Sequence, residues 1–232
     1  MKILAIDTSG QHAGAAIVDN YITIGEISFN ARTGEKSWTH SEILTPGINQ
    51  LFALTGIRKH EIDYIAYTNG PGSFTGLRIG ASTALGLARG LNKPTIPVPT
   101  LDALAYNVLG LQNSGVVVPM LDARRGQVYS AIYTQENGRM TDYLALPVEE
   151  LLAKVLDSSL VTVLGDGASE YASIISTALP NAIFAKQNNN RQRASSVALC
   201  AMELIATGFV PNDNVNILYV RAPQAVQQKK KP

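Results

Sequence analysis

Cysteine is nearly absent from this sequence of 232 residues, and charged residues are few. The single cysteine, Cys200, cannot form a disulfide within the chain, which favours a reducing compartment. Charged residues make up only 16% of the sequence, and 19 Lys and Arg against 18 Asp and Glu leave a net charge of +1. This balance excludes a general electrostatic attraction to nucleic acid, so any contact with RNA needs a local patch or a partner. The adjacent Arg124 and Arg125 either serve an anion or occupy a solvated corner, and we favour the corner.

Long apolar runs are also missing. No stretch approaches the roughly 18 consecutive apolar residues of a membrane span, and residues 1–6 lead directly into a strand-like pattern instead of a secretory leader. We therefore expect a cytoplasmic protein without membrane contact. Apolar residues nevertheless make up 46% of the chain, which is a globular composition with ample material for a core.

A glycine-rich loop and a helix follow the apolar strand expected at residues 63–68. The loop carries glycines at positions 70, 72 and 76, and the helical pattern continues to residue 90. Glycines between a strand and a helix permit close backbone approach and suit an anion site. The spacing matches neither the dinucleotide fingerprint nor the P-loop, so neither of these phosphate-binding motifs is present.

This helix has a ridge of small residues. Gly76, Gly80, Ala84 and Ala88 recur every four residues and share one face, which permits close approach of another helix. The helix is too apolar all round for a solvated surface, so it is buried either within its own domain or by a partner subunit. Under the second alternative, the residues expected to contact the partner are Gly76, Leu77, Gly80, Ala81, Ala84, Leu87 and Ala88.

The two halves of the chain show the same order of expected elements. Each half is predicted to form three strands, a helix, a strand, a glycine turn and a helix, and an acidic residue follows its first strand. These acids, Asp7 and Asp122, stand 115 positions apart. We infer a duplication, with an N-terminal lobe over residues 1–110, a C-terminal lobe over residues 111–226 and a basic flexible tail over residues 227–232.

Duplicated βββαβα lobes describe the α/β architecture of actin, Hsp70 and the sugar kinases (ASKHA), in which nucleotide lies between the lobes. The analogy predicts a fold and no activity. A further amphipathic helix is expected at residues 195–207, and by its position in the chain we assign it to the core of the second lobe.

Acidic side chains at the turns leave two interpretations open. Asp7, Asp122 and Asp166, with Ser9 beside the first of them, stand where an actin-like protein holds catalytic carboxylates or a magnesium shell. Because no phosphate loop accompanies them, they either cap their turns or make a weak contact with nucleotide.

Several strings of the sequence resemble the TsaB (YeaZ) family. They are IDTSG at 6–10, AYTNGPGSFTGLRIGASTALGLA at 66–88, KPTIPVPTLDALA at 93–105, MLDARRGQVYSAIY at 120–133 and LGDGA at 164–168. The resemblance covers most of the chain, and the GPGSFTGLR string is highly specific.

The resemblance implies a subunit of the bacterial machinery that makes threonylcarbamoyladenosine in tRNA. In that family the protein is a non-catalytic scaffold and activator that forms a heterodimer with its catalytic paralogue TsaD through N-lobe helices, and the ATPase TsaE joins them. The tRNA is then reached indirectly, and ATP or ADP enters only in the context of the complex. Because the small-residue ridge would be exposed without TsaD, we also expect the isolated chain to form a homodimer through the same helix.

This chain lacks the metal ligands that the resemblance implies for its catalytic relatives. Those relatives carry a metal-binding His-x-x-x-His after the strand that here reads TIPV. Thr100 and Leu104 stand in its place, and His12, His40 and His60 show no i, i+4 partner. We therefore expect no metal, no cofactor and no catalytic residue. The alternative, which rests on the duplicated lobes and their acids, is an autonomous ASKHA-type ATPase or small-molecule kinase.

Overall fold

The computed structural model describes residues 1–30, 39–109, 115–134, 136, 138–212 and 216–221. The chain forms two compact units, which are described separately. Unit 1 comprises Met1–Asn107 and Gln192–Ile217, and unit 2 comprises Val108–Arg191 and Leu218–Pro232. The tail expected at residues 227–232 lies outside the described residues. Among those residues, no helix is long and apolar enough to cross a membrane.

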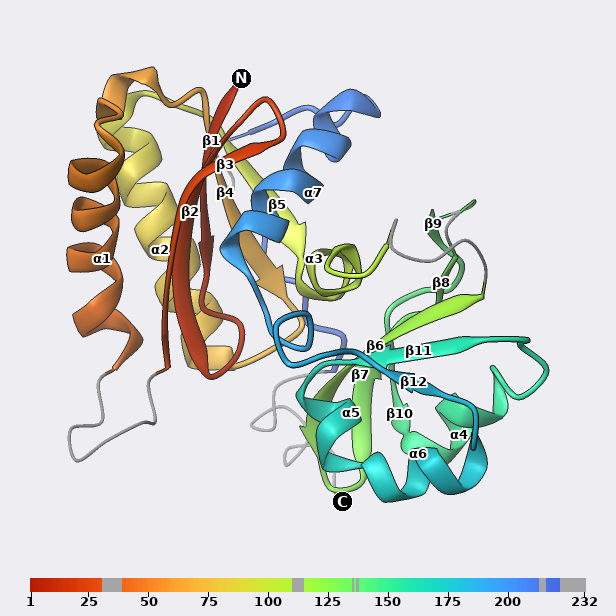
Figure 1. The fold of residues 1–232 in the computed structure, drawn as a ribbon. Coiled ribbons are helices and arrows are strands. Elements are labelled where there is room, and N and C mark those ends of the chain that lie inside the picture. The colour runs from red at the N-terminus through yellow and green to blue at the C-terminus, as the bar shows by residue number, and fades with distance from the viewer. Residues whose placement is uncertain (31–38, 110–114, 135, 137, 213–215, 222–232) are drawn as a thin grey trace, which may run out of the picture. The chain divides into compact units, whose positions relative to one another are not determined.

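Unit 1 is built on a five-stranded sheet with the strand order β3-β2-β1-β4-β5 (Figure 1). Its strands are β1 (Lys2–Asp7), β2 (His12–Asp19), β3 (Ile22–Asn30), β4 (Tyr64–Gly70) and β5 (Thr95–Pro99). The first three strands are antiparallel neighbours, whereas β4 and β5 run parallel to β1. The carboxyl ends of β1, β4 and β5 therefore meet at one edge of the sheet.

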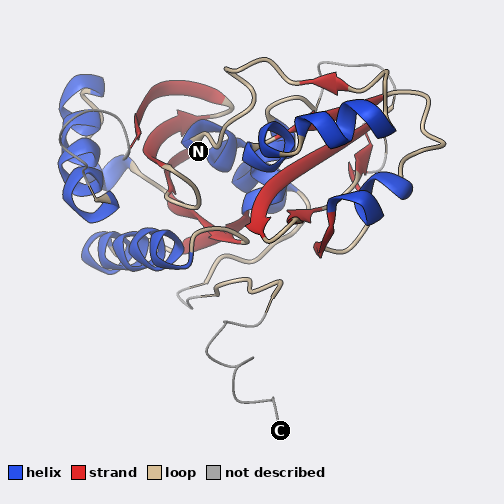
Figure 2. Ribbon diagram, turned by 90° about the horizontal axis from the view of Figure 1, so that it is seen from below, coloured by secondary structure: helices blue, strands red, loops and turns tan. Residues whose placement is uncertain are grey.

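Helices cover both faces of this sheet. The helices α1 (His40–Thr55) and α2 (Phe74–Leu91) lie on one face, and α3 (Thr100–Tyr106) and α7 (Ala194–Ala206) lie on the other (Figure 1). A short 3-10 helix, η1 (Lys59–Glu61), precedes β4. Figure 2 shows the molecule from below, with helices in blue and strands in red.

The alternation of side chains along β1 connects the two apolar layers. Leu4 and Ile6 point into the core formed with α1 and α2, while Ile3 and Ala5 point into the core formed with α3 and α7. All four side chains are fully buried. A central strand with both faces covered is expected to be apolar at every position, which is why the KILAI string has no polar alternation.

The position of α7 corrects one expectation. The helix was assigned to the second lobe, but Val197, Ala198 and Ala201 pack with Ile3 and Ala5 in the core of unit 1. The helix expected at residues 195–207 is present as α7, and its assignment to the second lobe was wrong. Periodicity shows that a helix is half-buried, and it does not show which sheet the helix covers.

A carboxylate on β3 holds the N-terminus of α7. Glu26 accepts a hydrogen bond from the Ser195 backbone N–H at 3.0 Å and one from the Ser195 hydroxyl at 2.9 Å. The Arg193 guanidinium lies 3.2 Å from the same carboxylate. A negative charge at a helix N-terminus satisfies unpaired N–H groups and interacts favourably with the helix dipole. Glu26 therefore fastens a late segment of the chain to an early strand.

We predict that Glu26→Ala lowers the free energy of unfolding by about 1–2 kcal/mol, since α7 loses its capping carboxylate. Glu26→Gln is the matched control, because it keeps an oxygen acceptor for Ser195 and loses only the charge. Glu26→Gln should lower the free energy of unfolding by less than Glu26→Ala does. Urea unfolding of the full chain measures both variants, and an unchanged stability in Glu26→Ala would contradict the capping role.

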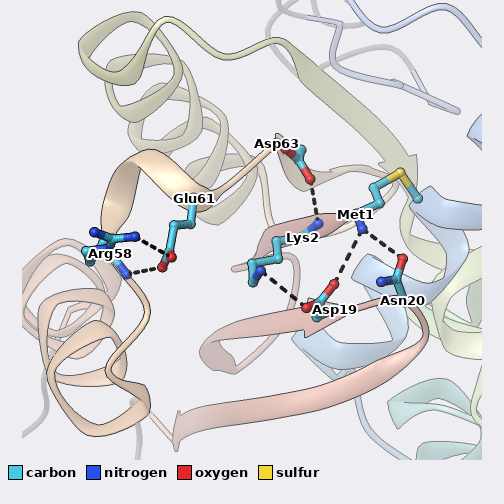
Figure 3. Close-up of polar contacts among 7 residues, drawn as sticks. All are labelled: Met1, Lys2, Asp19, Asn20, Arg58, Glu61 and Asp63. Atoms are coloured by element: carbon cyan, nitrogen blue, oxygen red, sulfur yellow. Dashed lines mark hydrogen bonds and ion pairs between the residues drawn. The ribbon is translucent and has the colours of Figure 1, made fainter.

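Polar contacts fix the start of β1 (Figure 3). The Met1 amine donates to Asn20 at 2.7 Å and lies 3.4 Å from the Asp19 carboxylate. The Lys2 ammonium lies 3.4 Å from Asp19, and the Lys2 backbone N–H donates to Asp63 at 2.8 Å. These contacts join β1 to the β2–β3 turn on one side and to the segment before β4 on the other.

Unit 2 repeats the topology of unit 1. Its sheet has the order β10-β7-β6-β11-β12, with β8 and β9 paired beside β6, and the antiparallel and parallel pairings match those of unit 1. The strands are β6 (Val116–Arg124), β7 (Gln127–Ser130), β8 (Tyr133–Thr134), β9 (Gly138–Arg139), β10 (Leu144–Pro147), β11 (Val161–Leu164) and β12 (Ile183–Phe184). The helices are α4 (Val148–Ala153), α5 (Asp166–Glu170) and α6 (Ala172–Ala178). The predicted duplication is confirmed.

Candidate functional site

The small-residue ridge of α2 faces the interior of unit 1. The Thr8 hydroxyl, in the turn after β1, donates to the Gly76 carbonyl oxygen at 2.7 Å. A methyl group on Gly76 would lie 2.0 Å from the Thr8 carbonyl oxygen, and one on Gly80 would lie 2.3 Å from the Thr8 hydroxyl oxygen. No side chain fits at either position. The two glycines therefore allow α2 to pack directly on the turn that follows β1.

The predicted partner contact of this ridge stays a prediction, and six of the seven residues expected to make it are buried within unit 1. Its small side chains serve close packing of the helix on its own sheet, which is the alternative that the sequence left open. Leu87 is half-buried and packs against the same core from its margin. The residues of the predicted interface that are buried within unit 1 are Gly76, Leu77, Gly80, Ala81, Ala84 and Ala88.

The loop before α2 is attached to the same turn. The Ser73 backbone N–H donates to the Ser9 carbonyl oxygen at 2.7 Å, and the Ser73 hydroxyl accepts from the Gly76 N–H at 3.3 Å as the N-cap of α2. A methyl group on Gly72 would lie 2.4 Å from the Ser9 carbonyl oxygen. The glycine-rich loop thus folds onto the first turn of the chain and positions the first residues of α2.

The outward face of α2 is the surface that this packing leaves exposed. Phe74 is 43% exposed, and the Arg78 guanidinium lies 3.9 Å from the centre of its ring. These two residues line a shallow hollow of about 460 Å³ together with Thr75, Ile79, Ser82 and Thr83. We name these six residues the outer α2 face.

Charge is scarce on the outer α2 face, where Arg78 is the single charged residue, and its guanidinium is stacked on an aromatic ring. Phe74, Arg78 and Ser82 recur every four residues, as the inner ridge does, so a period-four signal for this stripe was present in the sequence. It was missed because α2 carries small residues on both sides. A weakly charged helix face with an exposed aromatic group is suited to packing against another protein.

The Asp7 carboxylate is buried in its own turn. One oxygen, Oδ1, accepts hydrogen bonds from the Ser9 N–H at 2.8 Å, the Ser9 hydroxyl at 2.7 Å and the Thr68 hydroxyl at 3.1 Å. The other, Oδ2, is buried without a partner among the described residues, as are Asn69 Oδ1 and Thr100 Oγ1. Burial raises the pKa of Asp7 above its ordinary value of 3.8, and the hydrogen bonds from Ser9 and Thr68 oppose that shift.

The corresponding turn of unit 2 is arranged differently. Asp122 accepts from the Arg124 N–H at 2.8 Å and from the Tyr171 hydroxyl at 3.1 Å, and its other oxygen lies 3.1 Å from the Arg124 guanidinium. Asp166 accepts from the Asp122 N–H at 3.0 Å. Burial raises the pKa of Asp166, opposed by hydrogen bonds from the backbone of Asp122 and Gly167. Each of these acids makes the turn contacts that a capping role requires.

The two positions at which the resemblance implied that catalytic relatives carry histidines are core positions here. Thr100 and Leu104 lie on α3 and are 0% and 1% exposed. His40 begins α1, and its Nδ1 would lie 3.2 Å from a methyl group on Gly76. Among the described residues, no group of three or more His, Cys, Asp and Glu side chains is arranged to hold a metal ion.

Comparison with known proteins places the chain in a family. The fold is that of the actin, Hsp70 and sugar-kinase class, and a family model described as "TsaD: tRNA N6-adenosine threonylcarbamoyltransferase" matches residues 34–215. The chain belongs to this family.

The individual relatives agree with that result. The "tRNA threonylcarbamoyladenosine biosynthesis protein TsaB" of Haemophilus influenzae is 34% identical over 139 residues, which cover 60% of this chain and 56% of the relative. The match thus spans little more than half the length of that curated relative. The solved structure of YeaZ from Pseudomonas aeruginosa superposes with a TM-score of 0.75 at 24% identity, covering 94% of this chain and 99% of that one.

A more distant structure shares only the architecture. Component A of the Acidaminococcus fermentans (R)-2-hydroxyglutaryl-CoA dehydratase superposes with a TM-score of 0.51 at 13% identity, covering 89% of this chain and 99% of that one. The resemblance to the TsaB (YeaZ) family and the predicted fold class are both confirmed.

We predict that Gly76→Ala lowers the free energy of unfolding by about 2–3 kcal/mol, because the added methyl group collides with the Thr8 backbone. Gly86→Ala is the matched control on the same helix, since nothing lies within 4 Å of its added methyl group. That variant should gain about 0.5–1 kcal/mol from helix propensity. Urea unfolding of both variants tests whether the small-residue ridge faces the interior of unit 1. Equal changes in the free energy of unfolding for Gly76→Ala and Gly86→Ala would contradict it.

We predict that Asp7→Asn becomes more stable relative to the wild type as the pH rises from about 4. The pKa of Asp7 is raised in the folded state, so in the wild type the protonated carboxyl group stabilises the fold. This stabilisation is complete below the pKa of the unfolded chain and is lost as the pH rises through the pKa of the folded protein. An amide keeps an acceptor for Ser9 and Thr68 and does not ionise. Asp142→Asn, at a fully exposed side chain, is the control and should show a small difference at every pH. Stability differences for Asp7→Asn that are flat with pH would contradict this.

Proposed function

We propose that this chain is the non-catalytic scaffold and activator subunit of the machinery that makes threonylcarbamoyladenosine in tRNA, acting in the cytoplasm. It forms a heterodimer with TsaD and, with it, recruits TsaE. The tRNA is bound by the complex as a whole. Membership of the TsaD family and similarity to proteins named TsaB support this proposal.

The outer α2 face carries the proposal, because it is the surface on which TsaD would pack. Its six residues present one aromatic ring, one stacked guanidinium, one isoleucine and three small hydroxyl side chains around a hollow of about 460 Å³. A helix of the partner fits such a hollow, since small side chains permit close approach and the exposed Phe74 supplies an anchor. The helix proposed from the sequence is kept, and the contacting face is changed.

The isolated chain has the same face open to solvent. We propose that it forms a homodimer through the outer α2 face when TsaD is absent. An interface of this kind is isologous, with the same residues contributed by both copies. TsaD and a second copy therefore compete for one surface, and the homodimer dissociates as the heterodimer forms.

A non-catalytic role is supported by the environment of the residues at which metal ligands or catalytic acids were considered. Thr100 and Leu104 are packed in the core of unit 1, and the Asp7 and Asp122 carboxylates are engaged in their own turns. In this proposal a nucleotide is held together with the partner subunits, and this chain supplies neither a metal nor a cofactor of its own.

We predict that Ser82→Arg reduces capture of TsaD by at least about tenfold, because a bulky charge is forced into a close-packed interface. Ser82 is exposed, so the fold of the variant should be unchanged. Ser173→Arg introduces the same change at an exposed position on α6 and is the matched control. Capture of TsaD by the immobilised full chain measures all three proteins, and circular dichroism checks the fold.

Two outcomes would contradict the proposal. Wild-type capture of TsaD by Ser82→Arg would show that the interface lies elsewhere. Turnover of ATP by the purified chain without any partner would favour the autonomous ATPase. If Ser82→Arg captures TsaD like the wild type, sedimentation of this variant without TsaD should also show the same self-association as the wild type.

A further inference from the structure

The β6–β7 hairpin of unit 2 holds two arginines in a backbone conformation that L side chains disfavour. Arg124, Arg125 and Gly126 have φ angles of 66°, 59° and 73°, all in the left-handed region. Gly, Asn and Asp are the residues that usually occupy such positions, because other side chains crowd the backbone there. The hairpin therefore keeps arginine where a less strained residue would form the same turn.

Side chains from three segments fix the base of this hairpin. Asp122 accepts from the Arg124 N–H at 2.8 Å and from the Tyr171 hydroxyl at 3.1 Å. Arg221 donates to the Ala123 carbonyl oxygen at 3.2 Å and to the Gln127 side chain. The Val148 N–H also donates to the Gly126 carbonyl oxygen at 3.3 Å. The backbone at the base of the hairpin is thus fixed by hydrogen bonds, and the tip projects from it.

The charges at the tip are distributed unequally. The Arg124 guanidinium is paired with Asp122 at 3.1 Å, and Arg221 is used in the base of the hairpin, where it lies 5.7 Å from the centre of the Tyr129 ring. Arg125 is exposed and makes no hydrogen bond or ion pair with any residue that the structure describes. Three guanidinium groups therefore gather at one hairpin, and that of Arg125 is available to a ligand.

We propose that Arg125 binds a phosphate group of the tRNA backbone. This proposal rests on the proposed function, which brings the chain to tRNA. A chain with a net charge of +1 attracts RNA only through a local positive charge, and at this hairpin the exposed Arg125 guanidinium supplies one that no described carboxylate neutralises. The planar fork of arginine matches the geometry of a phosphate, and a fixed backbone reduces the ordering needed on binding. The solvated corner favoured from the sequence is replaced by a binding contact.

The test measures tRNA binding to the complex of the full chain with TsaD by fluorescence anisotropy over a series of salt concentrations. Arg125→Gln should weaken binding roughly 3–10-fold and reduce the slope of log K against log salt by about 0.7–0.9, as expected for one lost phosphate contact. Lys154→Gln removes one exposed positive charge from the same unit and is the matched control, with affinity and slope unchanged.

Arg125→Gly separates a binding role from a structural one. Glycine adopts the left-handed turn without crowding, so the midpoint of thermal unfolding should rise by about 2–4 °C. Affinity for tRNA should nevertheless fall as far as it does in Arg125→Gln. A lower midpoint in Arg125→Gly would show that the arginine stabilises the hairpin and would overturn the proposal.

Other outcomes would also overturn it. Wild-type affinity and slope in Arg125→Gln would exclude a phosphate contact, and an equal loss in Lys154→Gln would indicate general charge attraction. Loss of TsaD capture in Arg125→Gln would show that the guanidinium contacts a carboxylate of the partner protein. If the wild-type chain fails to capture TsaD at all, the proposed function fails first and this inference fails with it, which the capture assay reveals independently of the RNA measurement.

Discussion

The packing of Thr8 against two glycines of α2 is the contact on which unit 1 depends. Thr8 follows the central strand, with its backbone against Gly76 and its hydroxyl against Gly80, where a methyl group would lie 2.0 Å and 2.3 Å from its oxygens. This contact decides which side of α2 is inside. Because the inner side is committed to the turn after β1, the side that carries Phe74 and Arg78 is left exposed. The position of the proposed interface thus follows from a steric constraint on the opposite side of the helix.

The fold was largely predictable, because the signals that specify it are local. The repeated order of expected elements and the acidic residues at positions 7 and 122 indicated the duplication, and the main path of the two sheets shares one strand order. The side of α2 that faces inward was not predictable. Periodicity groups Gly76 with Gly80 and Phe74 with Arg78 and Ser82, and the helix is apolar enough all round that periodicity alone does not say which group faces the sheet. Only the position of Thr8, 68 residues before Gly76, distinguishes them.

The candidate site was less predictable than the fold, because its contacts join distant segments. The Ser73 N–H at the start of α2 donates to the Ser9 carbonyl oxygen, and no pattern near Ser9 indicates this. The two duplicated turns also differ in ways that their shared sequence does not show. Asp7 is buried and accepts only uncharged donors, whereas Asp122 is half-buried and is neutralised by Arg124. Equivalent positions in a duplicated chain can therefore have different electrostatics while the backbone topology stays the same.

The place of α7 in unit 1 has a consequence for synthesis on the ribosome. The sheet face that carries Ile3 and Ala5 is covered by Val197 and Ala198, which leave the exit tunnel after almost all of unit 2. Residues 108–191, which make up most of unit 2, are contiguous and are synthesised while unit 1 still lacks part of its cover. Most of unit 2 is thus inserted between the two segments of unit 1. The nascent chain exposes an apolar sheet face during this interval, which makes it a substrate for chaperones until the last helix arrives.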